Sequence, residues 1–184
     1  MTTVFVSGSI GIKKLDDNVQ NRLLNILKPE FKILIGDADG IDSAVQNFLK
    51  TQTAKNVIVY CSGEKPRNNL NDWPVRLVDT KFKAGTKSFF TAKDIQMADD
   101  AEFGLMIWDS KSTGTLKNII ELLSRGKKSV VYIYNIKKFI QITNVNEFEQ
   151  LITFMTESAS AVANEKLDLK NKIYSLKTEQ LPLL

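Results

Sequence analysis

Short apolar runs alternate with longer amphipathic stretches through the first 134 residues of the chain. The apolar runs are five or six residues long and occupy residues 3–7, 31–35, 56–61, 103–108 and 129–134. Between them, apolar residues at helical spacing mark residues 16–27, 41–50, 87–99 and 116–124. Because connections of ten or more residues join parallel strands, this order predicts a Rossmann-like, doubly wound α/β fold. We expect a mainly parallel sheet of about five to seven strands.

The remaining segments are less regular. Residues 62–86 are polar and form either a lid or an irregular crossing, with 75–78 as a candidate strand, and 138–142 is a candidate edge strand. Residues 146–176 carry apolar residues three and four positions apart, which predicts a long C-terminal helix. We therefore divide the chain into a Rossmann-like domain, residues 1–143, and a C-terminal helical extension, residues 144–184. The extension either packs on its own domain or pairs with a second copy in a homo-oligomer.

Composition excludes several classes of function. The chain has no histidine and one cysteine, Cys61, so it forms neither an internal disulfide nor a His/Cys zinc site. No apolar run approaches twenty residues and the first residues do not resemble a signal peptide, so we expect a cytoplasmic protein with no membrane partner. The net charge of +4 is spread over 25 basic and 21 acidic residues without a basic arm, which argues against nucleic acid as a partner.

Small and polar residues gather where three predicted strands end. The three loops contain Ser7, Gly8 and Ser9; Gly36, Asp37, Asp39, Gly40 and Asp42; and Ser110, Lys111, Ser112, Thr113, Gly114 and Thr115. Ligands of parallel sheets bind at the edge where the carboxyl ends of the strands meet. Glycines let backbone N–H groups approach an anion closely, and two of the loops lead into helix N-termini. The alternative, for each loop taken singly, is an ordinary turn or helix cap.

Carboxylates at this edge offer two kinds of chemistry. Asp39 can accept ribose hydroxyl protons or hold Mg²⁺ through water, which makes Mg²⁺ the one candidate cofactor. We expect Asp42 to cap the helix that begins beside it. Asp109, with Glu121 or Asp39, is a candidate acid/base pair for cleavage of an N-glycosidic bond. The loops contain neither a Walker phosphate loop nor a G-x-G-x-x-G fingerprint.

Cations and aromatic residues flank the same loops. Lys111, Lys93 and Lys87 are the lysines placed to meet a phosphate, and Lys111 ranks first because small residues surround it. Trp108 is a candidate for stacking on a base, although the last residue of a buried strand more often belongs to the core. We expect Phe90 to lie in the core as well.

Four short segments carry a family likeness when they are taken as a set. Residues 36–42 read Gly-Asp-Ala-Asp-Gly-Ile-Asp, residues 93–97 read Lys-Asp-Ile-Gln-Met, residues 112–115 read Ser-Thr-Gly-Thr, and Gly126-Lys127 lead into the last core strand. Over about residues 3–134 the set resembles the SLOG superfamily. This Rossmann-like group includes LOG-type nucleotide phosphoribohydrolases, DprA-type DNA-processing proteins and YspA-type nucleotide-binding proteins. The resemblance implies a nucleotide or nucleotide-derived ligand across the Gly36 and Gly114 loops.

The chain departs from these families at three positions. LOG-type enzymes carry a reactive Glu where this chain has Asn118, and an amide cannot act as a general base or nucleophile. Glu121, one helical turn further on, is the candidate substitute. Lys93 replaces an arginine near the phosphate and loses its bidentate fork. Asp39 stands where DprA-type and YspA-type proteins often have arginine, and an acid there would repel a DNA backbone.

These observations leave three functional hypotheses. The first is a sensor or binding protein for a nucleotide-like small molecule, working as a homo-oligomer whose C-terminal helix reports binding. The second is an enzyme that hydrolyses the N-glycosidic bond of a nucleoside monophosphate with Asp109, Glu121 and Asn118. The third is a DprA-like DNA-associated module, which the absence of an aromatic and basic stripe disfavours.

Overall fold

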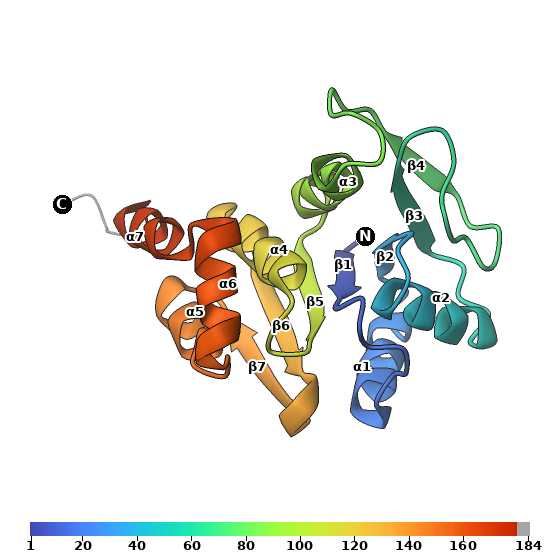
Figure 1. Cartoon of the computed structure of the whole chain (residues 1–184). Coiled ribbons are helices and arrows are strands. Elements are labelled where there is room, and N and C mark those ends of the chain that lie inside the picture. The colour runs from blue at the N-terminus through green and yellow to red at the C-terminus, as the bar shows by residue number, and fades with distance from the viewer. Residues whose placement is uncertain (180–184) are drawn as a thin grey trace.

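Seven strands form one sheet in the computed structural model, which describes residues 1–179 (Figure 1). They are β1 (Thr3–Gly8), β2 (Lys32–Gly36), β3 (Val57–Ser62), β4 (Val75–Val78), β5 (Phe103–Trp108), β6 (Lys128–Ile133) and β7 (Lys138–Ile142). Their order across the sheet is β4-β3-β2-β1-β5-β6-β7. Every neighbouring pair is parallel except β6 and β7, which run antiparallel. The predicted mainly parallel sheet is confirmed, and both candidate strands belong to it.

Helices cover both faces of the sheet, as a doubly wound fold requires. Helices α1 (Asp17–Leu27) and α2 (Ile41–Thr51) pack on one face with inward side chains such as Val6. Helices α3 (Lys87–Asp100) and α4 (Thr113–Ser124) pack on the other face with side chains such as Phe5. Adjacent residues of β1 thus face opposite cores, which is why buried parallel strands are apolar at every position.

The strand order reverses direction at β1. The chain runs outward from β1 through β2 and β3 to β4, then returns so that β5 pairs with the free side of β1. Gly8 pairs with Ile107 at the carboxyl ends of these two strands. At such a reversal the following loops diverge to opposite faces and leave a crevice in which ligands bind.

Three helices, not one, follow the sheet. A single-turn 3₁₀ helix, η1 (Tyr134–Ile136), joins β6 to β7, and then come α5 (Val145–Ile152), α6 (Glu157–Leu167) and α7 (Leu169–Glu179). Thr156 starts α6 because its side chain accepts the Ala159 N–H, and Asp168 ends α6 in the left-handed conformation at φ 52°. The expectation of one long C-terminal helix is therefore wrong. None of the helices within residues 1–179 is long and apolar enough to cross a membrane.

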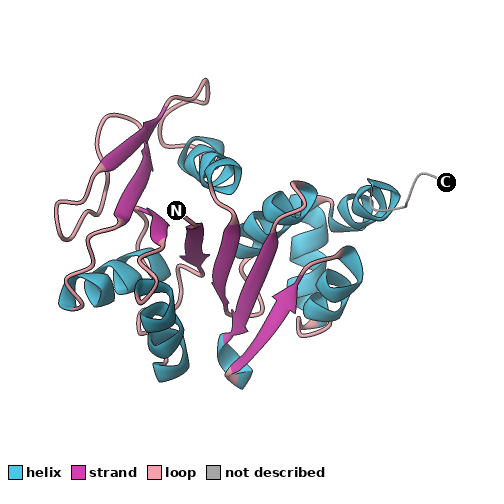
Figure 2. Cartoon of the chain, turned by 180° about the vertical axis from the view of Figure 1, so that it is seen from behind, coloured by secondary structure: helices cyan, strands magenta, loops and turns pink. Residues whose placement is uncertain are grey.

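The C-terminal helices pack on their own chain and gather at one end of the sheet (Figure 2). Phe148 and Leu151 of α5, and Leu169 and Leu176 of α7, are buried in the same hydrophobic core as Ile119 of α4. The apolar positions that suggested pairing with a second chain thus serve, at these four residues, to dock the extension. Pairing with a second copy stays a prediction.

Candidate functional site

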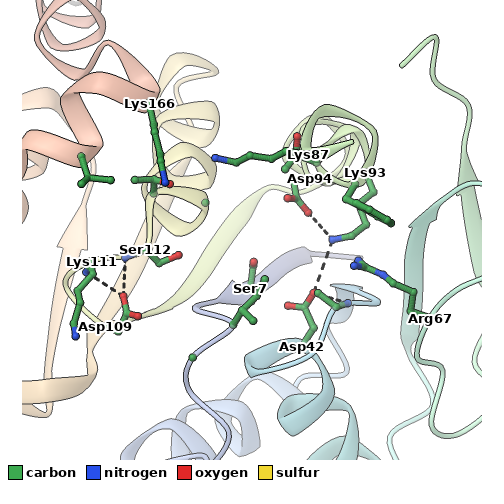
Figure 3. Close-up of a pocket in the computed structure, with 18 residues that line it drawn as sticks. Ser7, Asp42, Arg67, Lys87, Lys93, Asp94, Asp109, Lys111, Ser112 and Lys166 are labelled. Carbon is green, nitrogen blue, oxygen red and sulfur yellow. Dashed lines mark hydrogen bonds and ion pairs between the residues drawn. The ribbon is translucent and has the colours of Figure 1, made fainter. Parts of the chain in front are cut away.

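A cavity of about 570 Å³ opens at the reversal of strand order, between the loops that follow β1 and β5 (Figure 3). We call it the main cavity. Its walls come from the end of β1, both loops, the loop after β2 with the start of α2, the first turn of α4, one side of α3, loop 63–74 and α6. The lining residues are Ser7, Ile10, Gly11, Ala38, Asp42, Arg67, Lys87, Phe90, Thr91, Lys93, Asp94, Asp109, Lys111, Ser112, Thr113, Gly114, Val162 and Lys166.

The N-terminus of α4 forms one wall. The Oδ1 atom of Asp109 accepts the N–H groups of Lys111 (3.0 Å) and Ser112 (2.7 Å), which fixes the turn that enters the helix. The Ser112 hydroxyl then accepts the Thr115 N–H as the helix N-cap. Among the described residues, the N–H groups of Thr113 and Gly114 have no hydrogen-bond partner. They line the cavity at the positive end of the helix dipole, where an anion is stabilised.

The glycines of the three loops have different roles. A Cβ at Gly114 would meet only the Ser112 Oγ at 3.9 Å, so this glycine faces open space. A Cβ at Gly36 would collide with the Asp42 carboxylate and the Lys93 ammonium, and one at Gly8 would collide with the Ile107 carbonyl. Gly40 has φ +79°, which L side chains rarely adopt, and lies against Ile10. Gly8, Gly36 and Gly40 therefore allow close packing beneath the site and do not line it.

Four charged side chains, Asp42, Arg67, Lys93 and Asp94, line the opposite wall, and buried Asp37, which is outside the lining, completes this charged cluster. Arg67, in loop 63–74, donates two side-chain hydrogen bonds to the carboxylate of buried Asp37, which are 2.7 and 3.1 Å long. Its backbone N–H donates a third at 3.0 Å. Although burial raises the pKa of Asp37, the hydrogen bonds from Arg67 outweigh it and hold this pKa below its ordinary value.

Lys93 lies at the centre of this charged cluster. Its ammonium is 2.7 Å from Asp94, 3.8 Å from Asp42 and 4.0 Å from Asp37, and its side chain is 4% exposed. Burial lowers the pKa of Lys93, but Asp94 and Asp42 raise it above the ordinary value, so the amine stays charged. A lysine so neutralised contributes less to phosphate binding than the sequence indicated.

Asp42 has a role that the sequence did not indicate. The N-cap of α2 is Gly40, and no side chain caps this helix, so the capping role expected for Asp42 is wrong. Its carboxylate instead accepts the Ala38 N–H at 3.2 Å and faces Lys93. Burial raises the pKa of Asp42 to about 7, against the opposing effect of Lys93.

Three lysines line the main cavity and have no charged or hydrogen-bonded partner for their ammonium groups within the part of the chain that the structure describes. Lys87 comes from α3, Lys111 from the loop before α4, and Lys166 from α6. All three are exposed, and among the described residues none of their ammonium groups forms an ion pair or hydrogen bond. In Figure 3, Lys87 and Lys166 point toward each other above the cavity, and Lys111 lies across from the charged cluster. Together with the α4 N-terminus they give the cavity a positive side.

Hydrogen bonds join several predicted site residues, of which Ser7 lines the cavity, whereas Ser9, Thr115 and the candidate catalytic residue Asn118 lie outside the lining. The Asn118 amide donates to the Ser7 hydroxyl at 3.1 Å, and both residues are buried. The Ser9 hydroxyl lies 3.4 Å from that of Thr115 and accepts the Asp109 N–H at 3.1 Å. These bonds join the loops after β1 and β5, so they hold the two walls in position. Ser110 is also buried and has a left-handed backbone, with φ 63°.

The structure does not bring the predicted catalytic residues together. Asp109 lines the main cavity, whereas Glu121 lies further along α4, outside the lining. The Glu121 carboxylate is held by Arg125 at 2.7 Å. The Asn118 side chain is already hydrogen-bonded to the Ser7 hydroxyl. An acid/base pair of Asp109 and Glu121 across one bond is therefore not preformed.

Of the predicted aromatic residues and Asp39, only Phe90 lines the main cavity. Trp108 is fully buried and its indole N–H donates to the Ser112 carbonyl, so it belongs to the core and supports the α4 turn. Phe90, expected in the core, is half-buried and lines the cavity, with the Arg67 guanidinium 4.6 Å from its ring centre. Asp39 is exposed, lies outside the lining and accepts a hydrogen bond from Asn68. Within residues 1–179 no three His, Cys, Asp or Glu side chains are grouped to hold a metal ion.

Sequence reasoning missed two lining cations. Arg67 lies in the polar segment whose role was left open, and its partner Asp37 is 30 positions away. Lys166 lies in the C-terminal extension, which was assigned to packing or assembly and not to the site. Neither residue has a local sequence signal, because only the tertiary fold brings these segments to the cavity.

Comparison with known proteins adds no relative to this description. No family model matches the chain, and no curated protein matches it significantly.

Proposed function

We propose that the chain binds a nucleotide or a nucleotide-derived small molecule in the main cavity. The observation that carries the proposal is the convergence of three unpaired lysines, Lys87, Lys111 and Lys166, on a cavity that also receives the N-terminus of α4. The volume, about 570 Å³, lies in the usual range for small-molecule sites, roughly 300–1,000 Å³.

The phosphate belongs at the α4 wall. There the N–H groups of Thr113 and Gly114 would donate to phosphate oxygens, with Lys111 supplying positive charge. The opposite wall offers the Asp94 carboxylate as a hydrogen-bond acceptor and the Phe90 ring as an apolar surface, which suit a ribose and a base. The likeness of residues 36–42 and 112–115 to the SLOG superfamily supports the same class of ligand.

We also propose that the protein acts as a sensor or binding protein in a homo-oligomer. Phe154, after α5, and Tyr174, on α7, are 37% and 73% exposed, and unlike exposed Val162 of α6 they do not line the main cavity, so we assign the contact to them. Because α6 contributes Lys166 to the cavity, ligand binding and the arrangement of the C-terminal helices are coupled through this residue.

The test is a thermal-shift screen with mono-, di-, tri- and cyclic nucleotides, nucleosides and dinucleotides, with free base assayed by chromatography in the same samples. A ligand at a hundredfold excess over its Kd adds about 2.7 kcal/mol to the stability of the native state. We expect a phosphorylated compound to produce such a shift, with no release of base. Release of base would establish the glycosidase alternative, and no shift with any compound would overturn the proposal.

Gly114 provides a matched pair of variants for the same screen. Gly114→Asp places a carboxylate where the phosphate would bind and should abolish the shift. It should leave the unliganded protein as stable as wild type, because an acid near a helix N-terminus is favourable. Gly114→Ala adds only a Cβ in open space and should keep the shift. Equal binding by both variants would place the ligand elsewhere.

A further inference from the structure

A second, smaller cavity of about 270 Å³ adjoins the main cavity on the outer side of α4. The two cavities share Lys87, Thr91 and Lys166 in their walls. The second cavity extends from that shared wall between α3, α4 and the α6–α7 junction.

Four lysines face this second cavity from four helices. Lys87 lies on α3, Lys117 on α4, Lys166 on α6 and Lys172 on α7. Within the described part of the chain, none of the four ammonium groups forms an ion pair or a hydrogen bond. Like charges held around one concave surface repel each other and concentrate a positive potential there. An anion placed among them would relieve that repulsion.

The acid in this wall does not cancel the charge. Glu121 is the acidic member of the lining, and its carboxylate is paired with Arg125 at 2.7 Å. Arg125 is held in turn by Asp99. The charge of the Glu121 carboxylate is therefore balanced by Arg125, and the lysines make the electrostatic potential of the second cavity positive.

The spacing along α4 separates the two positive regions. Thr113 and Gly114 line the main cavity, and Lys117 and Glu121 line the second one. With a rise of about 1.5 Å per residue, the second cavity begins roughly 5 Å beyond Gly114 and ends roughly 10 Å beyond it. One phosphate group cannot occupy both regions, whereas a ligand with phosphates several bonds apart can.

We propose that the second cavity is an anion subsite for a further phosphate group of the same ligand. The inference rests on the proposed function and makes it more specific: the ligand is a nucleotide with at least two separated phosphates. A chain of linked phosphates and a second phosphorylated position on the sugar present the same chemistry. Lys117 and Lys172 are the residues that act in this subsite alone.

Titration calorimetry at fixed salt tests the subsite with inorganic phosphate, pyrophosphate and tripolyphosphate. We expect tripolyphosphate to bind wild type about tenfold more tightly than phosphate, because one added charge-assisted hydrogen bond lowers the Kd by about that factor. The double variant Lys117→Ala/Lys172→Ala should lose that gain and keep its affinity for phosphate. The control Lys55→Ala/Lys170→Ala removes the same charge from two exposed lysines outside both cavities and should keep the gain.

Failure of the subsite and failure of the proposed function give different results. If the lysine variant keeps the tripolyphosphate gain, or if the control loses it equally, the subsite is overturned and phosphate binding in the main cavity stands. If none of the three anions and no nucleotide binds wild type, the proposed function fails with it. Thermal melting of each unliganded variant shows that it is folded.

A second titration identifies the source of the further phosphate. It compares a nucleoside 5′-triphosphate with the 3′,5′-bisphosphate of the same base, the base being the one that gives the largest thermal shift. The compound whose affinity falls in Lys117→Ala/Lys172→Ala reaches the subsite. Unchanged affinity for both would overturn the subsite.

Discussion

Asp42 shows how one buried carboxyl group makes stability depend on pH. Burial raises its folded-state pKa to about 7, whereas in the unfolded chain it titrates near 3.8. Between these values the folded state binds more protons than the unfolded state, so the free energy of unfolding falls as pH rises. Lys93, Asp94 and Asp37 face it. The pKa of Lys93 is raised and that of Asp37 is lowered, so neither of these two groups changes charge over most of this interval.

We predict that Asp42→Asn removes most of this decline. The amide is neutral at every pH and its oxygen can still accept the Ala38 N–H, so the decline that Asp42 contributes between pH 4 and about 7 should be absent. Urea unfolding at a series of pH values measures the slope. Asp39→Asn, which changes an exposed carboxylate, is the control and should keep the wild-type slope. A wild-type slope in Asp42→Asn would contradict the raised pKa.

At the residue scale, sequence reasoning identified positions better than roles. Lys93 and Asp42 were placed at the correct edge of the sheet, but both are buried in one charged cluster, which is visible only when α3 lies over the β2 loop. Trp108 could be assigned to the core because the strand containing it is apolar throughout. The Arg67–Asp37 pair could not be predicted, because an ion pair between distant segments leaves no local pattern.

At the scale of elements, Arg67 is one of the side chains that attach loop 63–74 to the sheet, beside Asn68 and Trp73. We predict that Arg67→Ala loosens this loop, because two charge-assisted hydrogen bonds to Asp37 are lost. Losses of this kind cost about 1–3 kcal/mol. Amide hydrogen exchange should become faster in residues 63–74 and stay unchanged in β1 and β5. Arg76→Ala, an exposed arginine on β4, should leave exchange in the loop unaltered. Equal protection in Arg67→Ala would show that other contacts hold the loop.

The elements of the sheet were predictable, and the ends of the C-terminal helices were not. Buried parallel strands need apolar residues on both faces, so β1, β2, β3, β5 and β6 stand out as continuous runs. The break before α6 has a weak signal, Thr156 followed by Glu157, which is typical of a helix start. The break at Asp168 has neither Gly nor Pro, and the apolar spacing continues through it.

At the scale of the whole molecule, the proposed homo-oligomer has a limited contact surface. The apolar residues of α5 and α7 are largely used for docking. The large apolar side chains described as exposed at this end are Phe154, Val162 and Tyr174, and of these Val162 lines the main cavity. We predict that sedimentation shows an assembly whose mass falls to that of one chain in Phe154→Ser/Tyr174→Ser. Phe82→Ser, at a residue 52% exposed outside this surface, should keep the assembly. A wild-type monomer at high concentration would refute association through this end.

The main cavity uses residues from both ends of the chain, Ser7 on β1 and Lys166 on α6. During synthesis, a growing chain can assemble its first strands long before α6 leaves the ribosome, but it cannot yet complete the wall that Lys166 forms. The proposed ligand therefore recognises finished chains and stabilises them by mass action. Truncated products that end before residue 166 lack that stabilisation, so a protease would remove them selectively whenever the ligand is abundant.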